Sequence, residues 1–243
     1  MEQLPITTTK TVGETVAADY RTAAVFKQFG IDFCCGGKRS IEQVCEQKGI
    51  DPMLLQQALE QAQTAAGRSA MNFDAWNLSF LADYIVNKHH VYVQERLPQL
   101  VEYADKVARV HGEKFSPNLE VAALVNTLRD ELMGHMLKEE RILFPYIKVM
   151  EQAKQNGLPK PAPHFGTAAG PVNVMEAEHE VAGAIMQRIR EITNDYTLPE
   201  EACNTWRVLW SLLPEFEEDL HQHVHLENNI LFPKTLQMEE DFR

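Results

Sequence analysis

The stretch His135-Met-Leu-Lys-Glu-Glu-Arg-Ile-Leu-Phe-Pro145 recurs 88 residues further along the chain as His223-Val-His-Leu-Glu-Asn-Asn-Ile-Leu-Phe-Pro233. The two stretches share six of eleven positions: the histidine, a glutamate four residues later, and the closing Ile-Leu-Phe-Pro. Two other histidines in helical surroundings, His90 and His179, lie 89 residues apart. A duplicated two-helix unit explains both spacings, and it predicts two halves related by a pseudo-twofold axis.

Apolar residues recur at intervals of three and four through most of the 243 residues, and alternating strand-like runs are almost missing. Long helical segments are expected at about 77–111, 118–150, 172–194 and 200–238. A loop rich in Pro and Gly at 156–171 separates the second segment from the third, and the other connections are short. Short connections favour antiparallel neighbours, so the sequence predicts an all-α protein with an up-down four-helix bundle. Kinks or helix ends are expected near the prolines inside these segments, which are Pro98, Pro145, Pro214 and Pro233.

The sequence pattern predicts a small N-terminal helical domain that spans residues 1 to about 68. Helices are expected at about 15–28, 40–48 and 51–65, with Ser40 and Asp51 as N-caps. A tight turn at 31–38 connects the first two. The stretch Gly67-Arg-Ser-Ala70 is expected to be a linker, so the bundle domain would span 69–243.

Composition excludes several classes of protein. Lys and Arg number 23 against 35 Asp and Glu, a formal net charge of −12, whereas nucleic-acid binders and peripheral membrane proteins usually present basic faces. No apolar run is long enough to span a membrane, and no basic-then-apolar leader begins the sequence. The four cysteines, two of them adjacent, do not resemble a disulfide framework. We therefore expect reduced thiols and a cytoplasmic location, with no nucleic-acid or membrane partner.

The repeated His-x-x-x-Glu predicts a metal centre. Residues four apart share one helix face, so His135 lies with Glu139 and His223 with Glu227. Facing inward, they present two imidazoles and two carboxylates to one cavity, which His90 and His179 complete to four imidazoles. Two octahedral irons offer about 12 coordination positions, of which these ligands and a bridging oxygen fill about ten. About two positions stay open for water or a small diatomic molecule.

Other interpretations of the histidines stay open at this point. Each histidine taken singly fits a capped or exposed position on an amphipathic helix. A ferritin-like site would use Glu-x-x-His, which occurs at Glu176/His179 and Glu218/His221. Yet His221 and His225 lie about 200° around the helix from His223, so we expect them in solvent or behind the ligands. The remaining histidines, His89, His111 and His164, are expected at the surface or in loops. Zinc hydrolase chemistry is disfavoured, because His-Glu-x-x-His and a compact cysteine set are missing.

These patterns resemble a known family. The four-helix half is similar to a hemerythrin-like domain, and Asp32-Phe-Cys-Cys-Gly-Gly-Lys38 resembles the short domain that precedes it in the repair-of-iron-centres di-iron proteins of the YtfE/ScdA type. The resemblance covers nearly the whole chain, except for a longer N-terminal tail and a longer loop before Pro171. It implies two non-haem irons with oxo or hydroxo and carboxylate bridges, and an acidic residue, Glu178, near the metals. The ligands that it implies are His90, His135, Glu139, His179, His223 and Glu227.

The adjacent Cys34 and Cys35 are candidates for a catalytic or iron-handling role. Adjacent cysteines do not readily form a disulfide with each other. The glycines Gly36 and Gly37 expose backbone donors, and Lys38 with Arg39 adds positive charge, so we expect a lowered thiol pKa and a reactive turn. The alternative is that both cysteines are small core residues. The isolated Cys45 and Cys203 are expected to pack in the interior.

The resemblance implies repair of iron–sulfur clusters damaged by nitrosative or oxidative stress, with iron or NO exchanged at the di-iron site. The implied partners are damaged iron–sulfur proteins or a cluster-assembly scaffold, together with NO or O2. A hemerythrin-like carrier or sensor of O2 or NO is one alternative, and a di-iron NO reductase is another. Because no sequence feature separates NO reduction from repair, enzymatic activity is left open, as is the oligomeric state.

Overall fold

The computed structural model describes residues 10–64 and 71–242, and within these ranges every extended regular element is a helix. The N-terminal elements are α1 (Val12–Ala18), α2 (Thr22–Gln28), the 3-10 turn η1 (Cys35–Lys38), α3 (Ile41–Lys48) and α4 (Pro52–Thr64). A second 3-10 turn, η2 (Phe73–Ala75), precedes the bundle. The all-α fold predicted from the sequence is confirmed, while the expected linker at Gly67–Ala70 lies outside the described residues.

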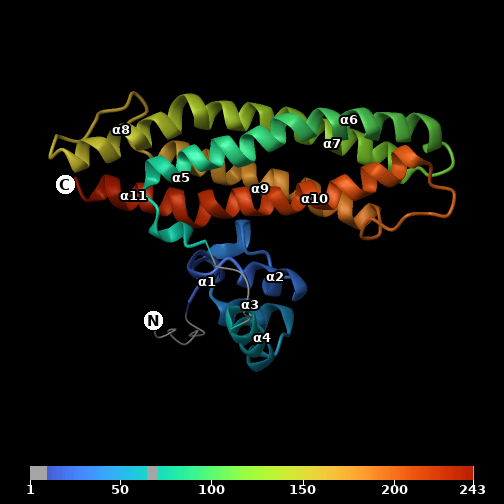
Figure 1. Ribbon diagram of the computed structural model, residues 1–243, viewed down its shortest axis with the longest axis horizontal. Coiled ribbons are helices and arrows are strands. Elements are labelled where there is room, and N and C mark those ends of the chain that lie inside the picture. The colour runs from blue at the N-terminus through green and yellow to red at the C-terminus, as the bar shows by residue number, and fades with distance from the viewer. Residues whose placement is uncertain (1–9, 65–70, 243) are drawn as a thin grey trace.

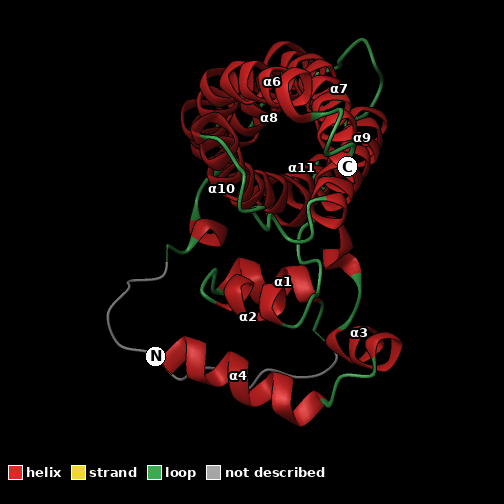
Figure 2. Ribbon diagram, turned by 90° about the vertical axis from the view of Figure 1, so that its right-hand side faces the viewer, coloured by secondary structure: helices red, strands yellow, loops and turns green. Residues whose placement is uncertain are grey.

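Four long antiparallel rods form the bundle (Figure 1), and seen end-on they surround a common axis (Figure 2). The first rod joins α5 (Leu78–Tyr84), η3 (Ile85–His90) and α6 (Val91–His111). The second joins α7 (Pro117–Lys138), η4 (Glu139–Leu143) and α8 (Phe144–Gln155). The third is α9 (Ala169–Ile192), and the fourth joins α10 (Asn204–Leu226), η5 (Glu227–Leu231) and α11 (Phe232–Glu240). The up-down bundle is therefore as predicted, with α6 packed against both α7 and α10, and α7 against α9.

Three of these rods change locally from α-helix to π-helix, in η3, η4 and η5. In the repeated Glu-x-x-Ile-Leu-Phe-Pro, the proline stands in the first turn of α8 or α11, directly after η4 or η5. Proline has no N–H to donate to the preceding turn, so a change of hydrogen-bond register is expected there. Helices thus change at Pro145 and Pro233, as predicted, whereas α6 and α10 continue through Pro98 and Pro214.

The N-terminal helices differ from expectation in one respect. The single helix predicted at about 15–28 is two helices, α1 and α2, separated at Asp19. The Asp19 backbone is extended, and its side chain accepts hydrogen bonds from the backbone N–H and the guanidinium of Arg21. A side chain that offers the backbone this local alternative interrupts a helix. Ser40 caps α3 as predicted.

Two apolar clusters form the core, and the N-terminal helices share the larger one. Val12, Phe26 and Phe33 belong to the same buried cluster as Leu97, Val125 and Leu220 of the bundle. The second cluster occupies the other end of the bundle, around Phe144 and Phe232. The N-terminal part therefore packs against one side of the bundle, through α1 and η1 on α9 and η5 (Figure 2).

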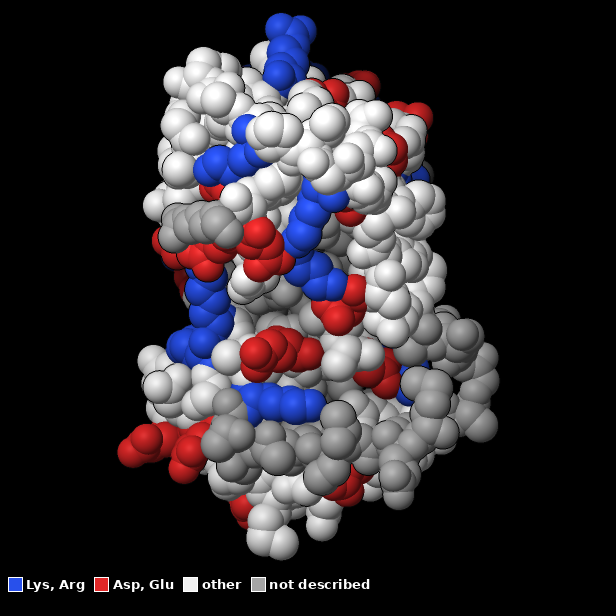
Figure 3. Space-filling model, turned by 90° about the vertical axis from the view of Figure 1, so that its left-hand side faces the viewer, with Lys and Arg blue, Asp and Glu red and all other residues white. Residues whose placement is uncertain are grey.

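Acidic and basic side chains are interspersed on the bundle end shown in Figure 3. On that view no continuous basic surface is visible among the coloured residues. Among the described helices, none combines the length and the apolar character that crossing a lipid bilayer requires.

Candidate metal centre

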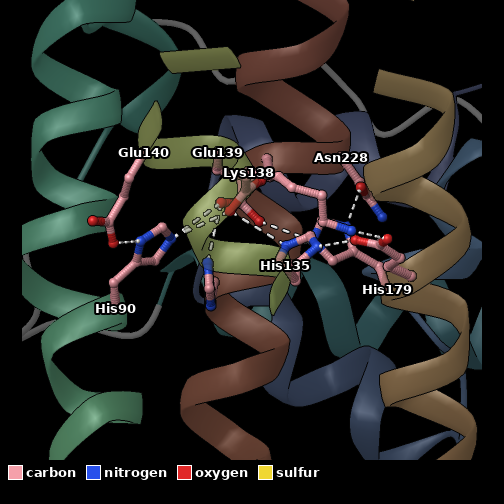
Figure 4. A network of polar contacts seen from close by, with 10 residues as sticks. His90, His135, Lys138, Glu139, Glu140, His179 and Asn228 are labelled. Atoms are coloured by element: carbon pink, nitrogen blue, oxygen red, sulfur yellow. Dashed lines mark hydrogen bonds and ion pairs between the residues drawn. The ribbon is translucent and has the colours of Figure 1, made fainter. Parts of the chain in front are cut away.

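All six side chains predicted as ligands meet at one level of the bundle, between the two apolar clusters. Each rod contributes: His90 ends η3, His179 lies in the middle of α9, and each copy of the repeat brings its histidine and glutamate. Figure 4 shows His90, His135, Glu139 and His179 pointing toward one another. Every one of the six is at most 2% exposed. The complete set is His90, His135, Glu139, His179, His223 and Glu227.

Donor atoms of these residues form two groups that share both glutamates. One group is His90, His223, Glu139 and Glu227, and the other is His135, His179 and the same two glutamates. Within each group the donor atoms all lie within 4.8 Å of one another. A carboxylate shared by two donor groups is the arrangement that lets it bridge two metal ions.

Individual distances show how the glutamates lie between the imidazoles. Glu139 Oε2 is 3.3 Å from both His90 Nε2 and His135 Nε2 (Figure 4). Glu227 lies 3.1 Å from His179 Nε2 through Oε2, and 3.1 Å from His223 Nε2 through Oε1. Each carboxylate therefore reaches one imidazole of either group.

Several buried polar atoms of this cluster lack hydrogen-bond partners among the described residues. They include His90 Nε2, both oxygens of Glu139 and Glu227 Oε2. In addition, His135 Nε2 and His179 Nε2 face each other at 2.9 Å, with their outer nitrogens already engaged. Buried polar atoms without partners destabilise a fold by about 1–3 kcal/mol each. Metal ions would satisfy them, and imidazole with carboxylate is a donor set that suits iron.

The outer nitrogens of three histidines are held by hydrogen-bond partners. His90 Nδ1 lies 2.8 Å from Glu140, His135 Nδ1 2.9 Å from Glu178, and His179 Nδ1 2.8 Å from Asn228 (Figure 4). Such contacts fix the tautomer and the ring orientation, so that Nε2 faces the centre. Glu178 also pairs with Lys138. Glu178 was expected near the centre, whereas sequence reasoning missed Glu140 and Asn228.

The internal repeat carried a signal for these missed residues. Glu140 and Asn228 are 88 residues apart, as are the two copies of the motif, and they support the related histidines His90 and His179. Both follow directly after the repeated glutamates, at a position where the two copies differ in residue type but both carry a side-chain oxygen acceptor.

The pseudo-symmetry breaks at His223. The position equivalent to Glu178 in the other half is His89, and its ring stacks on that of His223 at 5.5 Å between centroids. His223 Nδ1 therefore has no hydrogen-bond partner among the described residues. The expectation that His89 lies at the surface is wrong, because it is fully buried with Nδ1 3.1 Å from Asp219.

Electrostatics at the centre favour ionised carboxylates. Burial and the charge of Glu227 oppose ionisation of Glu139, but the adjacent His135 and His90 lower its pKa. Burial likewise opposes ionisation of Glu227, but the charge of His223 and the nearby imidazoles of His179 and His90 hold its pKa well below the usual value. Conversely, burial would lower the pKa of His90, but the two carboxylates raise it to about 10. The cluster thus has a strong affinity for positive charge.

The cysteine turn lies directly against this centre. Cys35 Sγ is 3.6 Å from the backbone carbonyl oxygen of His179. The side-chain amide of Asn229, two residues after Glu227, donates to the carbonyl oxygens of Phe33 and Cys34 at 3.2 and 3.1 Å. Both sides of the turn are therefore attached to segments that carry candidate ligands.

The expected lowering of the thiol pKa is wrong for Cys34. Its hydrogen bond with Cys35, its burial and the nearby Asp32 raise the pKa of Cys34 well above the ordinary value. Of the positive charges invoked from the sequence, Lys38 pairs with Glu176, whereas Arg39 stays beside the turn and donates to the carbonyl oxygen of Gly36 and to Gln47. Instead, the carboxylate of Asp32 accepts hydrogen bonds from the N–H groups of the turn.

For the remaining histidines and cysteines, the observed burial agrees with the prediction at some positions and differs at others. Of the two positions expected for His225, in solvent or behind the ligands, solvent is wrong, because the N-terminal residues Tyr20 and Phe33 cover it and it is fully buried. Cys45 is buried as expected, but Cys203 is exposed, with Sγ 3.2 Å from His111 Nε2. His164 is exposed as predicted.

Comparison with known proteins follows the same division of the chain. Residues 81–235 match the family described as Hemerythrin HHE cation binding domain, and residues 8–63 match ScdA_N, a domain of unknown function. A protein of Musicola paradisiaca (strain Ech703) named "Iron-sulfur cluster repair protein YtfE" is 40% identical over 230 residues, 95% of this chain and 97% of the relative. Proteins of the same name from Yersinia pestis (strain Pestoides F) and Yersinia pseudotuberculosis serotype IB (strain PB1/+) are 38% identical over 95% of this chain and 98% of theirs.

Proposed function

Since this chain belongs to the family of YtfE-type iron–sulfur cluster repair proteins, in which an ScdA_N domain precedes a hemerythrin HHE domain, we propose that it repairs damaged iron–sulfur clusters by means of two bound irons. One iron would be held by His90 and His223, and the other by His135 and His179. Both would share Glu139 and Glu227 as bridging carboxylates.

The observation that carries this proposal is the sharing of the two glutamates by two donor groups. A single ion would leave two imidazoles without a role, whereas two ions use all six residues. Two bridging carboxylates also offset the positive charge that buried metal ions bring into an apolar interior. Bound there, the irons would supply redox chemistry and open positions for a diatomic molecule such as NO or O2.

The residues around the ligands have separate tasks in this proposal. Glu140, Glu178 and Asn228 orient three imidazoles through their Nδ1 atoms. Burial opposes ionisation of Glu178, but hydrogen bonds from Lys138 and His135 lower its pKa, so it stays a carboxylate. Because Lys138 is partly exposed, this pair lies between the centre and solvent and suits an approach path for small ions.

We assign Cys34 and Cys35 to the exchange of iron or NO between the centre and a damaged client. The contact of Cys35 with the His179 backbone supports this role. The clients would be iron–sulfur proteins or a cluster-assembly scaffold in the cytoplasm, where nitrosative or oxidative stress destroys their clusters. We further propose that the chain divides at about residue 69 into the cysteine-containing domain and the di-iron domain, which then cooperate across their shared core.

Reactivation of a [4Fe–4S] dehydratase inactivated by NO tests the function. The iron-loaded protein should restore activity, and Glu227→Gln should not, because the neutral amide cannot bridge. Glu191→Gln is the matched control, since Glu191 is exposed on the same helix as His179 and does not line the cleft beside the cysteine turn. Circular dichroism verifies that both variants keep their helices. If Glu227→Gln repairs at the wild-type rate, the two irons are not the repair centre. Catalytic conversion of NO to N2O without any reactivation would identify an NO reductase instead.

A further inference from the structure

The cysteine turn carries a second set of metal-binding atoms, outside the six-residue centre. Asp32, Cys34 and Cys35 each offer one donor atom, and these three atoms lie within 4.8 Å of one another. The two sulfurs are 4.0 Å apart, and Cys34 Sγ is 3.1 Å from Asp32 Oδ1. Two thiols and one carboxylate on one side of an open space form an incomplete coordination shell.

The spacing of these atoms suits a tetrahedral ion. Metal–sulfur bonds of about 2.3 Å place two thiolates on such an ion roughly 3.8 Å apart. The observed 4.0 Å between the sulfurs therefore requires a shift of only a few tenths of an ångström. Thiolate ligands favour iron, zinc and similar cations over magnesium or calcium.

The turn is held in this shape from two sides. Asp32 accepts hydrogen bonds from the backbone N–H groups of Cys34, Cys35 and Gly36 at 2.9, 3.1 and 2.9 Å. From the bundle, Asn229 donates to the carbonyl oxygens of Phe33 and Cys34. The backbone of Gly37 approaches Asn229 so closely that a Cβ atom there would lie 2.3 Å from its Oδ1. Binding a cation would thus need little reorganisation of the backbone.

The donors open into a cleft that gives access from solvent. Its volume is about 440 Å³, and Asp32, Cys34 and Cys35 are part of its lining. Lys27 and Arg190 line the same cleft together with Glu180 and Glu217, and Arg190 is paired with Glu217. His221 lines the cleft as well, so the cleft also contains an imidazole. A hydrated ion or a donor group from a client protein has room to enter.

We propose that Asp32, Cys34 and Cys35 form a separate thiolate–carboxylate site that binds one divalent iron as cargo. That the cargo is iron rests on the repair function proposed above, whereas the existence of the site rests on its own geometry. Cys35 is in contact with the backbone of His179, so an ion held here is next to the di-iron centre without sharing its ligands. The site would hold iron between the centre and a client at the mouth of the cleft.

Cobalt(II) is a suitable probe, because thiolate ligands give it intense near-ultraviolet charge-transfer absorption that His and Glu ligands do not. The full-length, iron-containing protein is titrated anaerobically with cobalt chloride. We expect sulfur-to-cobalt bands that saturate at one cobalt per chain and disappear when iron(II) is added in excess. The Cys34→Ser, Cys35→Ser double variant should lose the bands, and Asp32→Asn should weaken binding by about tenfold or more while keeping an acceptor for the turn.

Cys203→Ser is the matched control, because Cys203 is an exposed thiol beside the imidazole of His111. It should keep the bands unchanged. The proposed site is wrong if the bands vanish in Cys203→Ser or persist in the double variant. It is also wrong if the titration of the wild-type protein shows no sulfur-to-cobalt bands. If zinc(II) removes the bands but iron(II) does not, the site exists and iron as cargo is wrong. Iron content of the bundle and reactivation of the dehydratase are measured in parallel, so failure of the repair function is recognised separately.

Discussion

Cys35 Sγ lies 3.6 Å from the backbone carbonyl oxygen of His179, so the N-terminal cysteine turn contacts a residue whose side chain belongs to the metal centre. The contact joins parts of the chain that are 144 residues apart. The fold therefore brings two thiols and the nitrogen–oxygen donor cluster side by side while keeping their donor atoms separate. In the function proposed above, this arrangement would let one protein hold iron and pass it on.

The fastest-reacting thiol should be that of Cys203 and not that of Cys34. Cys203 is exposed, whereas Cys34 is buried and its pKa is raised by its bond with Cys35, by burial and by Asp32. A raised pKa leaves less thiolate at neutral pH, so labelling of Cys34 should accelerate only at more alkaline pH than for an ordinary thiol. Stopped-flow labelling with a disulfide reagent at pH 7 should show one fast thiol that Cys203→Ser abolishes. A fast phase that disappears with Cys34→Ser would contradict the buried position.

Loss of Asn228 should weaken the metal centre on one side. Its side-chain oxygen is 2.8 Å from His179 Nδ1 and orients that imidazole. Removing such a supporting contact typically weakens metal binding about 10–100-fold. Asn228→Ala should therefore lose iron to a chelator faster than the wild type, as followed by absorbance. Asn156→Ala, which removes only an exposed amide bonded to Gln152, should behave as the wild type does. Equal rates for all three proteins would show that Asn228 does not support a ligand.

Much of the fold, and the six side chains that meet in the bundle, could be predicted from the sequence. Both depend on regular spacings within the chain: the helical period and the internal repeat. The four-residue spacing of His135 and Glu139 fixes a shared helix face, and the 88-residue repeat copies it. What could not be predicted depends on contacts between distant segments. His225 is buried because Tyr20 and Phe33 cover it. The pKa of Cys34 is raised rather than lowered by its hydrogen bond with Cys35, by burial and by Asp32. The π-helical turns were not predicted either, because a proline indicates that an α-helix is interrupted but not which conformation replaces it.

The buried carboxylate of Glu217 should make Arg190 important for stability. Glu217 is 4% exposed, and Arg190 donates to it through Nε at 3.2 Å. Arg190→Met should lower the free energy of unfolding by roughly 3 kcal/mol, because it leaves a buried charge without its partner. Arg188→Met on the same helix removes only an exposed pair with Glu120 and should change it by less than about 0.5 kcal/mol. Urea denaturation measures both, and a similar small effect for both would refute the role of the buried pair.

Close packing of the cysteine turn on the bundle makes Gly37 sensitive to substitution. A Cβ atom there would lie 2.3 Å from Asn229 Oδ1 and displace the amide that holds the turn. Gly37→Ala should therefore reduce the free energy of unfolding by about 1–3 kcal/mol. Gly134→Ala meets open space within a helix and should instead raise it by about 0.5–1 kcal/mol. If thermal denaturation shows Gly37→Ala to be neutral, the turn is not tightly packed on Asn229.

Anomalous X-ray diffraction at the iron absorption edge, from crystals of the iron-loaded protein, tests the two-metal centre most directly. Two peaks about 3.5–4 Å apart are expected, a separation typical of paired metal sites. One should lie between His90 and His223 and the other between His135 and His179, with Glu139 and Glu227 contacting both. A single peak, or two peaks that do not share these glutamates, would contradict the account.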